Sequence, residues 1–136
     1  MLTVKTKLGK SEIAGIGLFA DEFIPKDTII WEYEPGLDIK FSSPEYDSII
    51  DPIYKKFLNT YCFKYNNEYY LCVDNGRFFN HSNTPNCYSD NTDAIWSTGV
   101  TKALRDIEKD EELTDDYSKF GYNELDIEFN KIYYEI

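Results

Sequence analysis

Short apolar runs separated by turn residues dominate the chain, and they predict a mainly β protein with short helices. Residues 2–8 alternate loosely between apolar and polar and predict an edge strand. Residues 28–33 are β-prone throughout and predict a buried strand. The run 61–73 predicts a β-hairpin that turns at residues 66–68.

Two proline signatures interrupt the strand pattern and predict a small helical insert. Ser43-Pro44 and Asp51-Pro52 each place an N-cap residue directly before a proline suited to the first helical turn. We therefore expect one or two short helices across residues 44–60. The candidate inward positions are Ile49, Ile50, Ile53, Phe57 and Leu58.

The expected hairpin also bears on the cysteines. If Tyr65 pairs with Tyr69, Cys62 lies opposite Cys72, where a cross-strand disulfide would have to form. Three cysteines, an odd number without tight spacing, instead indicate a reducing compartment. The alternative, a metal site built from Cys62, Cys72, Cys87 and His81, lacks any CxxC pair.

Downstream of the hairpin, residues 89–92 predict a turn, and Ile95-Trp96 belong to a further strand. Residues 104–117 predict a strand, an acidic turn and a short strand. Residues 122–136 mix aromatic and acidic side chains and predict no particular element. With 136 residues, 42% of them hydrophobic, we expect a single domain over 1–136.

The net charge of -11 narrows the classes of partner. Such acidity argues against direct nucleic-acid binding and favours a basic protein or peptide, although it also serves solubility alone. Residues 1–7 contain no long apolar run, and no stretch has membrane-spanning length. We expect an intracellular, cytoplasmic protein without membrane contact.

The most unusual stretch is 77–87, where two phenylalanines run into the single histidine and a cluster of small polar residues. Buried polar groups persist only when each finds a partner. This segment should therefore be held by distant parts of the chain or by a ligand. Two other segments stand out in order around it: SEIAGIGLFA at 11–20 and ELTDDY at 112–117.

Together with NHSNTPNC at 80–87, these segments resemble the SET-domain family of protein-lysine methyltransferases. The resemblance covers the core motifs across 11–117 and leaves 118–136 as a C-terminal segment. It implies a β-clip of small curled sheets, in which the last motif threads beneath a loop to form a C-terminal pseudoknot. It also implies S-adenosylmethionine as methyl donor, a lysine side chain in a basic protein as acceptor, and no metal.

Residue chemistry fits that implication. Methyl transfer from a sulfonium to an amine requires alignment of three atoms and a neutral lysine, and it requires neither a metal nor a covalent intermediate. A narrow aromatic channel beside a positive sulfonium lowers the lysine pKa from its usual 10.4. Tyrosine hydroxyls and backbone carbonyls hold the methyl group by weak CH···O contacts. The 12 tyrosines of this chain suit such a channel.

The resemblance also implies roles for individual residues. Tyr117 and Tyr33 match the catalytic tyrosines, although an extra residue separates Tyr33 from the following glycine. Asn80 and His81 would seat the donor, the asparagine with its side chain and both partly through backbone groups. The donor's amino-acid end would meet the backbone of Ala14, Gly15, Ile16 and Gly17.

Three departures from the family pattern carry consequences. No cysteine cluster follows Tyr117, so Phe120 and Tyr122 become the candidates for covering the adenine. Ser89 and Asp115 stand where relatives place bulky aromatics in the substrate channel. A wider or wetter channel would permit more than one methyl per lysine.

These departures leave a second class of function open, a catalytically silent SET-fold binding module. A third, a metal hydrolase using His81, fails on its ligand count. So small a domain would also suit a homodimer that completes its site.

Overall fold

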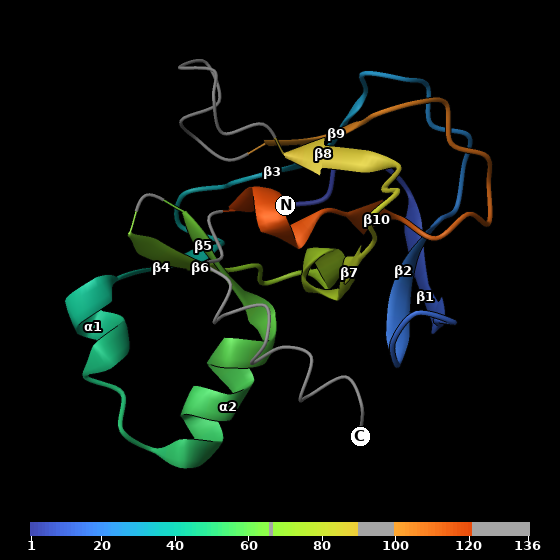
Figure 1. Ribbon diagram of the computed structural model, residues 1–136. Coiled ribbons are helices and arrows are strands. Elements are labelled where there is room, and N and C mark those ends of the chain that lie inside the picture. The colour runs from blue at the N-terminus through green and yellow to red at the C-terminus, as the bar shows by residue number, and fades with distance from the viewer. Residues whose placement is uncertain (66, 90–99, 121–136) are drawn as a thin grey trace.

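The computed structural model describes residues 1–65, 67–89 and 100–120. The expected strand through Ile95-Trp96 and the segment 122–136 lie outside these residues. Figure 1 shows many short strands, with two helices at one end and the β1–β2 pair at the other. The mainly β architecture predicted from the sequence is confirmed.

The described strands form four small sheets. β1 (Thr6–Lys10) pairs antiparallel with β2 (Ile16–Ala20). A second sheet has the order β3 (Ile29–Glu32), β9 (Val100–Ala103), β8 (Cys87–Ser89), and a third the order β4 (Ile39–Ser42), β6 (Glu68–Leu71), β5 (Cys62–Tyr65). The fourth is a parallel pair of β7 (Asn80–His81) and β10 (Thr114–Asp115).

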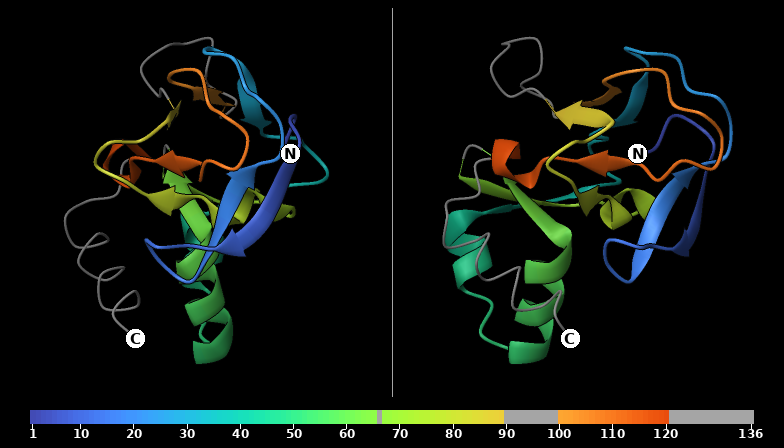
Figure 2. Two further views of the ribbon diagram at one scale, coloured as in Figure 1. Left: turned by 90° about the vertical axis from the view of Figure 1, so that its right-hand side faces the viewer. Right: turned by 45° about the vertical axis from the view of Figure 1, so that its right-hand side comes forward.

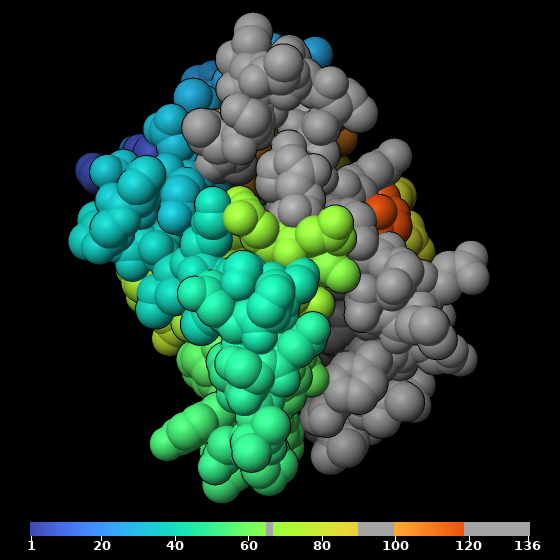
Figure 3. All heavy atoms as spheres, turned by 90° about the vertical axis from the view of Figure 1, so that its left-hand side faces the viewer, coloured from blue at the N-terminus to red at the C-terminus, as the bar shows by residue number. Residues whose placement is uncertain are grey.

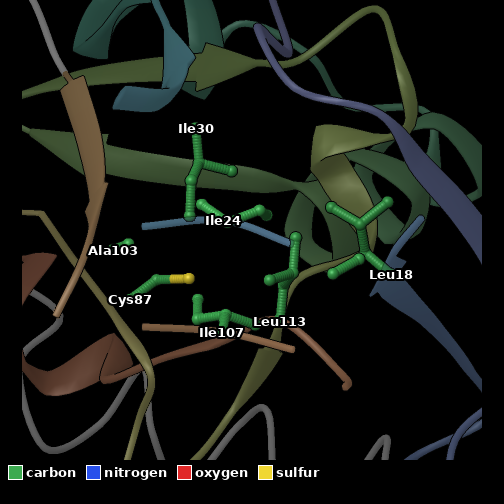
Figure 4. Close-up of a cluster of buried hydrophobic side chains, with 8 residues drawn as sticks. Leu18, Ile24, Ile30, Cys87, Ala103, Ile107 and Leu113 are labelled. Atoms are coloured by element: carbon green, nitrogen blue, oxygen red, sulfur yellow. The ribbon is translucent and has the colours of Figure 1, made fainter. Parts of the chain in front are cut away.

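One buried cluster joins the first two sheets to the segment 107–113, as Figure 4 shows. Burial of such apolar surface contributes roughly 25 cal/mol for each Å² removed from water. The cluster therefore holds together strands that share few backbone pairings. Its fully buried members are Leu18, Ala20, Ile24, Ile30, Cys87, Ala103, Ile107 and Leu113.

The segment 107–117 forms a seam, which pairs in turn with three separate parts of the chain. Ile107 exchanges two backbone hydrogen bonds with Ile24, at 2.8 and 2.9 Å. The Leu113 N–H donates to the carbonyl of Leu18 at 2.7 Å, and β10 then pairs with β7. In Figure 1, β10 lies between β7 and β8, which is the arrangement expected of the pseudoknot.

Asn86 closes the other side of the seam. This buried side chain donates from Nδ2 to the carbonyl of Glu112 at 2.8 Å and accepts at Oδ1 from the N–H of Thr114 at 2.9 Å. The Asn86 amide thus makes the hydrogen bonds that a neighbouring strand would otherwise make to the Glu112 carbonyl and the Thr114 N–H, so neither backbone group is left without a partner.

The helices α1 (Ser43–Asp47) and α2 (Pro52–Tyr61) begin at the predicted signals, with one shift. Asp51 caps α2 as expected, accepting from the N–H groups of Ile53 and Tyr54. The cap of α1 is Ser42 rather than Ser43, because Ser42 forms a reciprocal capping box with Glu45. Figure 3 shows the two helices forming the lower end of the molecule.

The predicted inward face of α2 is largely wrong. Ile50, Ile53 and Phe57 are 90%, 75% and 46% exposed, whereas Leu58 is buried and Ile49 packs beside it. The packed stripe follows positions 55, 58 and 62: Lys55 Nζ lies 3.9 Å from the centre of the Tyr46 ring, and Leu58 and Cys62 pack on Tyr46.

The predicted hairpin register is also wrong. Tyr65 pairs with Glu68, not Tyr69, because a two-residue turn joins the strands, with Asn67 at φ 61°. Cys62 therefore lies opposite Leu71 instead of Cys72. Phe63 stacks on Tyr70, with ring centroids 5.2 Å apart, on one face of this sheet.

The N-terminal strands follow the sequence more closely. The strand expected at 2–8 forms as β1, shifted to Thr6–Lys10, while Leu2 makes a single bridge to Trp31. β3 lies inside the predicted run 28–33, with Ile30 and Trp31 buried. Figure 2 shows the β1–β2 pair at the side of the molecule away from the two helices.

The three cysteines are free thiols in the structure and are all buried. Burial raises the pKa of the Cys62 thiol to about 12. Of the helices in the described parts of the chain, none combines the length and apolar character needed to cross a bilayer.

The Asn86 amide generates a stability prediction. Asn86→Ala should lower the free energy of unfolding by roughly 2–4 kcal/mol, because it leaves the buried N–H of Thr114 and the partly buried carbonyl of Glu112 without the Asn86 amide. Urea unfolding monitored by circular dichroism measures the change. Asn83→Ala, in the exposed part of the same loop, is the control and should change stability by no more than about 0.5 kcal/mol. Equal effects of the two variants would contradict the structural role of Asn86.

Candidate active site

The carboxylate of Glu112 joins the three sequence motifs. Its Oε2 accepts a hydrogen bond from Ser11 Oγ at 3.0 Å, and its Oε1 accepts from Asn80 Nδ2 at 2.9 Å. Gly17 makes room for it, because a Cβ there would lie 2.8 Å from Glu112 Cδ and 3.1 Å from Ser11 Cβ. Ser11, Gly17, Asn80 and Glu112 thus form one contact, the Glu112 clamp.

Asn80 is buried and directs its amide nitrogen into the protein. Besides Glu112, Nδ2 approaches the carbonyl oxygens of Ala14 at 3.1 Å and Ile16 at 3.3 Å. An amide nitrogen has only two hydrogens, so these three acceptors occupy its capacity. Asn80 therefore fixes the 14–16 backbone, and its side-chain N–H groups are not spare for a ligand.

The loop 11–17 presents backbone to the surface. Ser11 Oγ accepts from the N–H groups of Ile13 at 2.9 Å and Ala14 at 3.2 Å, which holds the turn. Gly15 has φ +48° and is exposed, and no atom lies within 4 Å of where its Cβ would stand. A non-glycine residue would be strained there and would obstruct the open backbone.

His81 has a defined tautomer. Its Nδ1 accepts the backbone N–H of Tyr117 at 3.1 Å, so the ring proton must sit on Nε2, which then donates to Asn83 Oδ1 at 3.0 Å. The histidine ties the start of the 3-10 helix Tyr117–Phe120 to β7. It acts as a structural acceptor in this arrangement.

The two predicted catalytic tyrosines lie on different elements. Tyr117 is half-buried, its hydroxyl donates to the carbonyl of Phe79, and its ring centroid lies 5.4 Å from that of His81. Tyr33 follows β3, and its ring meets Tyr70 edge-on at 5.3 Å. The structure thus brings Tyr117 together with Asn80 and His81, while Tyr33 joins the aromatic face of β6.

Ser89 and Asp115, predicted separately for the substrate channel, contact each other. Ser89 Oγ donates to Asp115 Oδ2 at 3.0 Å and lies 2.8 Å from Thr101 Oγ1. All three side chains are buried, Asp115 to 2% exposure. Burial is the largest cause that raises the pKa of Asp115 to about 7, against the lowering effect of its hydrogen bonds from Ser89 and Asp116.

The remaining predicted positions are less defined. Phe120 ends the 3-10 helix, but its side chain lies outside the described part of the structure, as does all of Tyr122. In the described ranges, no three His, Cys, Asp or Glu side chains are grouped to hold a metal ion.

Sequence reasoning assigned no role to Glu112 or Thr101. Glu112 is the first residue of the ELTDDY motif and directly precedes Leu113, which is fully buried. An acidic side chain next to a core position indicates a specific hydrogen-bond partner, and this signal could have identified Glu112. Thr101 carried no such signal, because only strand pairing brings it opposite Ser89.

Comparison with known proteins agrees with this geometry. The SET domain family model matches residues 15–118. The chain is 36% identical over 125 residues to the histone-lysine N-methyltransferase, H3 lysine-36 specific, of Schizosaccharomyces pombe. The match covers 82% of this chain but only 14% of that protein.

A solved structure of a candidate histone methyltransferase from Plasmodium falciparum is also similar. It superposes with a TM-score of 0.61 at 27% identity, covering 91% of this chain and 99% of that one. The family model includes the end of the open loop from Gly15, the Asn80-His81 pair and Tyr117. The Glu112 clamp and the β7–β10 pairing bring these parts together. The chain belongs to the SET domain family.

Proposed function

We propose that this chain is an S-adenosylmethionine-dependent protein-lysine N-methyltransferase. The observation that carries the proposal is the Glu112 clamp, which holds an exposed glycine loop against Asn80. Asn80 lies on β7, and β7 pairs with β10, the strand that ends just before Tyr117. Membership of the SET domain family supports the reaction class, and the names of both relatives point to lysine in a protein.

The donor would lie along the loop 14–17. The bound donor supplies a sulfonium methyl group. Gly15 fits this role because its backbone is open on the side where a Cβ would stand, so a ligand can approach closely. Asn80 would act on the donor indirectly, by fixing the carbonyls of Ala14 and Ile16. His81 would contact the donor through its backbone groups. Phe120 and Tyr122 stay our candidates for covering the adenine.

The lysine would enter between the segments that carry Tyr117 and Tyr33, with Ser89 and Asp115 along its path. Holding the amine in line with the methyl group supplies several kcal/mol of the barrier. The Tyr117 hydroxyl, anchored to the Phe79 carbonyl, has a fixed position for orienting the amine. Ser89 and Asp115 are smaller than the bulky aromatics that the family pattern places there, so we propose more than one methyl per lysine.

The substrate we propose is a lysine-rich tail of a basic, histone-like protein. The net charge of -11 would steer such a chain toward the enzyme and repel nucleic acid. Dimerisation remains a proposal for how a small domain completes its site.

Tyr117→Phe tests the proposal most directly. The rate of methyl transfer to a lysine-rich histone-tail peptide should fall about 10²–10³-fold, because one oriented hydroxyl is lost from the reaction centre. Donor affinity, measured by calorimetry, should stay within about threefold. Tyr54→Phe, whose ring is 66% exposed, is the matched control and should react like the unmodified protein. Mass spectrometry of the peptide would count the methyl groups.

Two outcomes would contradict this assignment. An unchanged rate for Tyr117→Phe would remove Tyr117 from the site. Donor binding without transfer to any basic protein would favour a silent binding module.

The clamp generates a second prediction. Gly17→Ala should weaken donor binding by about tenfold or more, because the new methyl group displaces the Glu112 carboxylate from Ser11 and Asn80. Gly9 pairs with Gly17 in the same hairpin, and a Cβ at Gly9 would meet only the Phe19 ring. The Gly9→Ala variant should therefore bind the donor almost as well as the unmodified protein. If both variants bound the donor equally well, the clamp would not shape the donor site.

A further inference from the structure

Asp115 is a buried carboxyl whose hydrogen bonds come from neutral donors. Its Oδ1 accepts the N–H of Asp116 at 2.7 Å, and its Oδ2 accepts Ser89 Oγ at 3.0 Å. Because Ser89 donates to Asp115, its contact with Thr101 must be donated by the threonine. Each carboxyl oxygen keeps a further lone pair for another partner.

No cationic side chain forms an ion pair with Asp115 within the described segments. The titratable groups on the elements around it are His81 on β7, Cys87 and Tyr88 on β8, Lys102 on β9, and Asp116 and Tyr117 on its own segment. Of these, Asp116 raises the pKa of Asp115 further by its negative charge. Buried charges in proteins are normally paired, and among the described residues no cation balances the charged form of this carboxyl.

The place of Asp115 suggests what that partner is. It lies on β10, two residues before Tyr117. Its hydrogen-bond chain runs through Ser89 to Thr101, which pairs with Trp31 on β3, two residues before Tyr33. The acid therefore connects the two segments whose tyrosines we place around the substrate lysine, which enters as a cation.

We propose that Asp115 is the base that removes the proton from the substrate lysine before methyl transfer, an inference that rests on the proposed function. In this step the Asp115 carboxylate accepts a proton from the lysine ammonium, leaving a neutral amine and a neutral carboxylic acid. The amine lone pair then forms the new N–C bond while the donor's C–S bond breaks. The proton on Asp115 passes to solvent after the methylated lysine leaves.

The acidities of the two groups are suited to this exchange. A lysine near a sulfonium in an apolar channel has its pKa lowered below its usual value of about 10.4, but it still enters as a cation at pH 7. The buried Asp115 has its pKa raised to about 7. Proton transfer is most effective when the pKa of the base lies near the working pH, and a positioned base contributes about 10²–10⁴-fold.

The test is the pH dependence of single-turnover methyl transfer by the whole chain with S-adenosylmethionine and a lysine-rich histone-tail peptide. We expect the unmodified protein to reach its plateau near neutral pH. Asp115→Asn should be about 10²-fold slower at pH 7, and its rate should rise about tenfold per pH unit as solvent deprotonates the lysine. The gap between the two should therefore close by about pH 9–10.

Ser89→Ala is the matched variant. It removes a hydrogen bond that lowers the pKa of Asp115, so that pKa rises. The rising limb of the pH profile should therefore move up by about one pH unit. A purely structural role for the trio would instead lower the rate at every pH.

Folding is checked separately by urea unfolding and by calorimetry with the donor alone. The pKa of Asp115 is higher in the folded than in the unfolded chain. Between about pH 4 and 7 the folded chain therefore binds the proton more tightly, and the free energy of unfolding falls as the pH rises through this range. Asp115→Asn lacks this cost and should be at least as stable as the unmodified protein at pH 8, with unchanged donor affinity.

An Asp115→Asn profile parallel to that of the unmodified protein would overturn the base assignment while leaving the methyltransferase proposal intact. Failure of the unmodified protein to transfer methyl groups to any lysine would instead overturn the proposed function itself.

Discussion

The Glu112 carboxylate is the contact on which the site depends. It reaches a serine from the N-terminal loop and an asparagine from the middle of the chain, and it occupies space that only a glycine at position 17 leaves free. Charge-assisted hydrogen bonds of this kind are roughly twice as strong as neutral ones. The exposed loop 14–16 has little burial of its own, so this carboxylate and Asn80 determine its shape.

Local signals predicted the elements whose cause is local. Asp51 starts α2 because a side-chain oxygen before a proline satisfies the first free N–H groups. β3 forms within the run 28–33, where β-branched and aromatic side chains cover the core. The polar residues around Asn80 indicated only that this segment needs partners from elsewhere in the chain or from a ligand. The family resemblance, and no local signal, implied that the Tyr117 motif lies beside it, as the β7–β10 pairing shows.

The errors arose where tertiary packing decided between similar patterns. α2 carries apolar residues on two stripes, and the sequence does not say that Lys55 and Leu58, rather than Ile53 and Phe57, face Tyr46. The hairpin shifted by one residue because the turn took two residues instead of three, which placed Glu68 rather than Tyr69 opposite Tyr65. The contact of Ser89 with Asp115 spans 26 residues, and no local periodicity encodes it.

The seam at 107–117 has a kinetic consequence. Its contacts reach back 32 residues from Glu112 to Asn80 and 101 residues to Ser11. Each such contact requires the loss of loop-closure entropy before it gives any stabilisation, and topologies rich in long-range contacts fold slowly. The hairpins can form while the seam is still open, whereas the apolar cluster is complete only when Ile107 and Leu113 of the seam have packed into it. We therefore expect the site to be assembled in the last cooperative step of folding, so that a chain able to bind the donor is one that has already completed its fold.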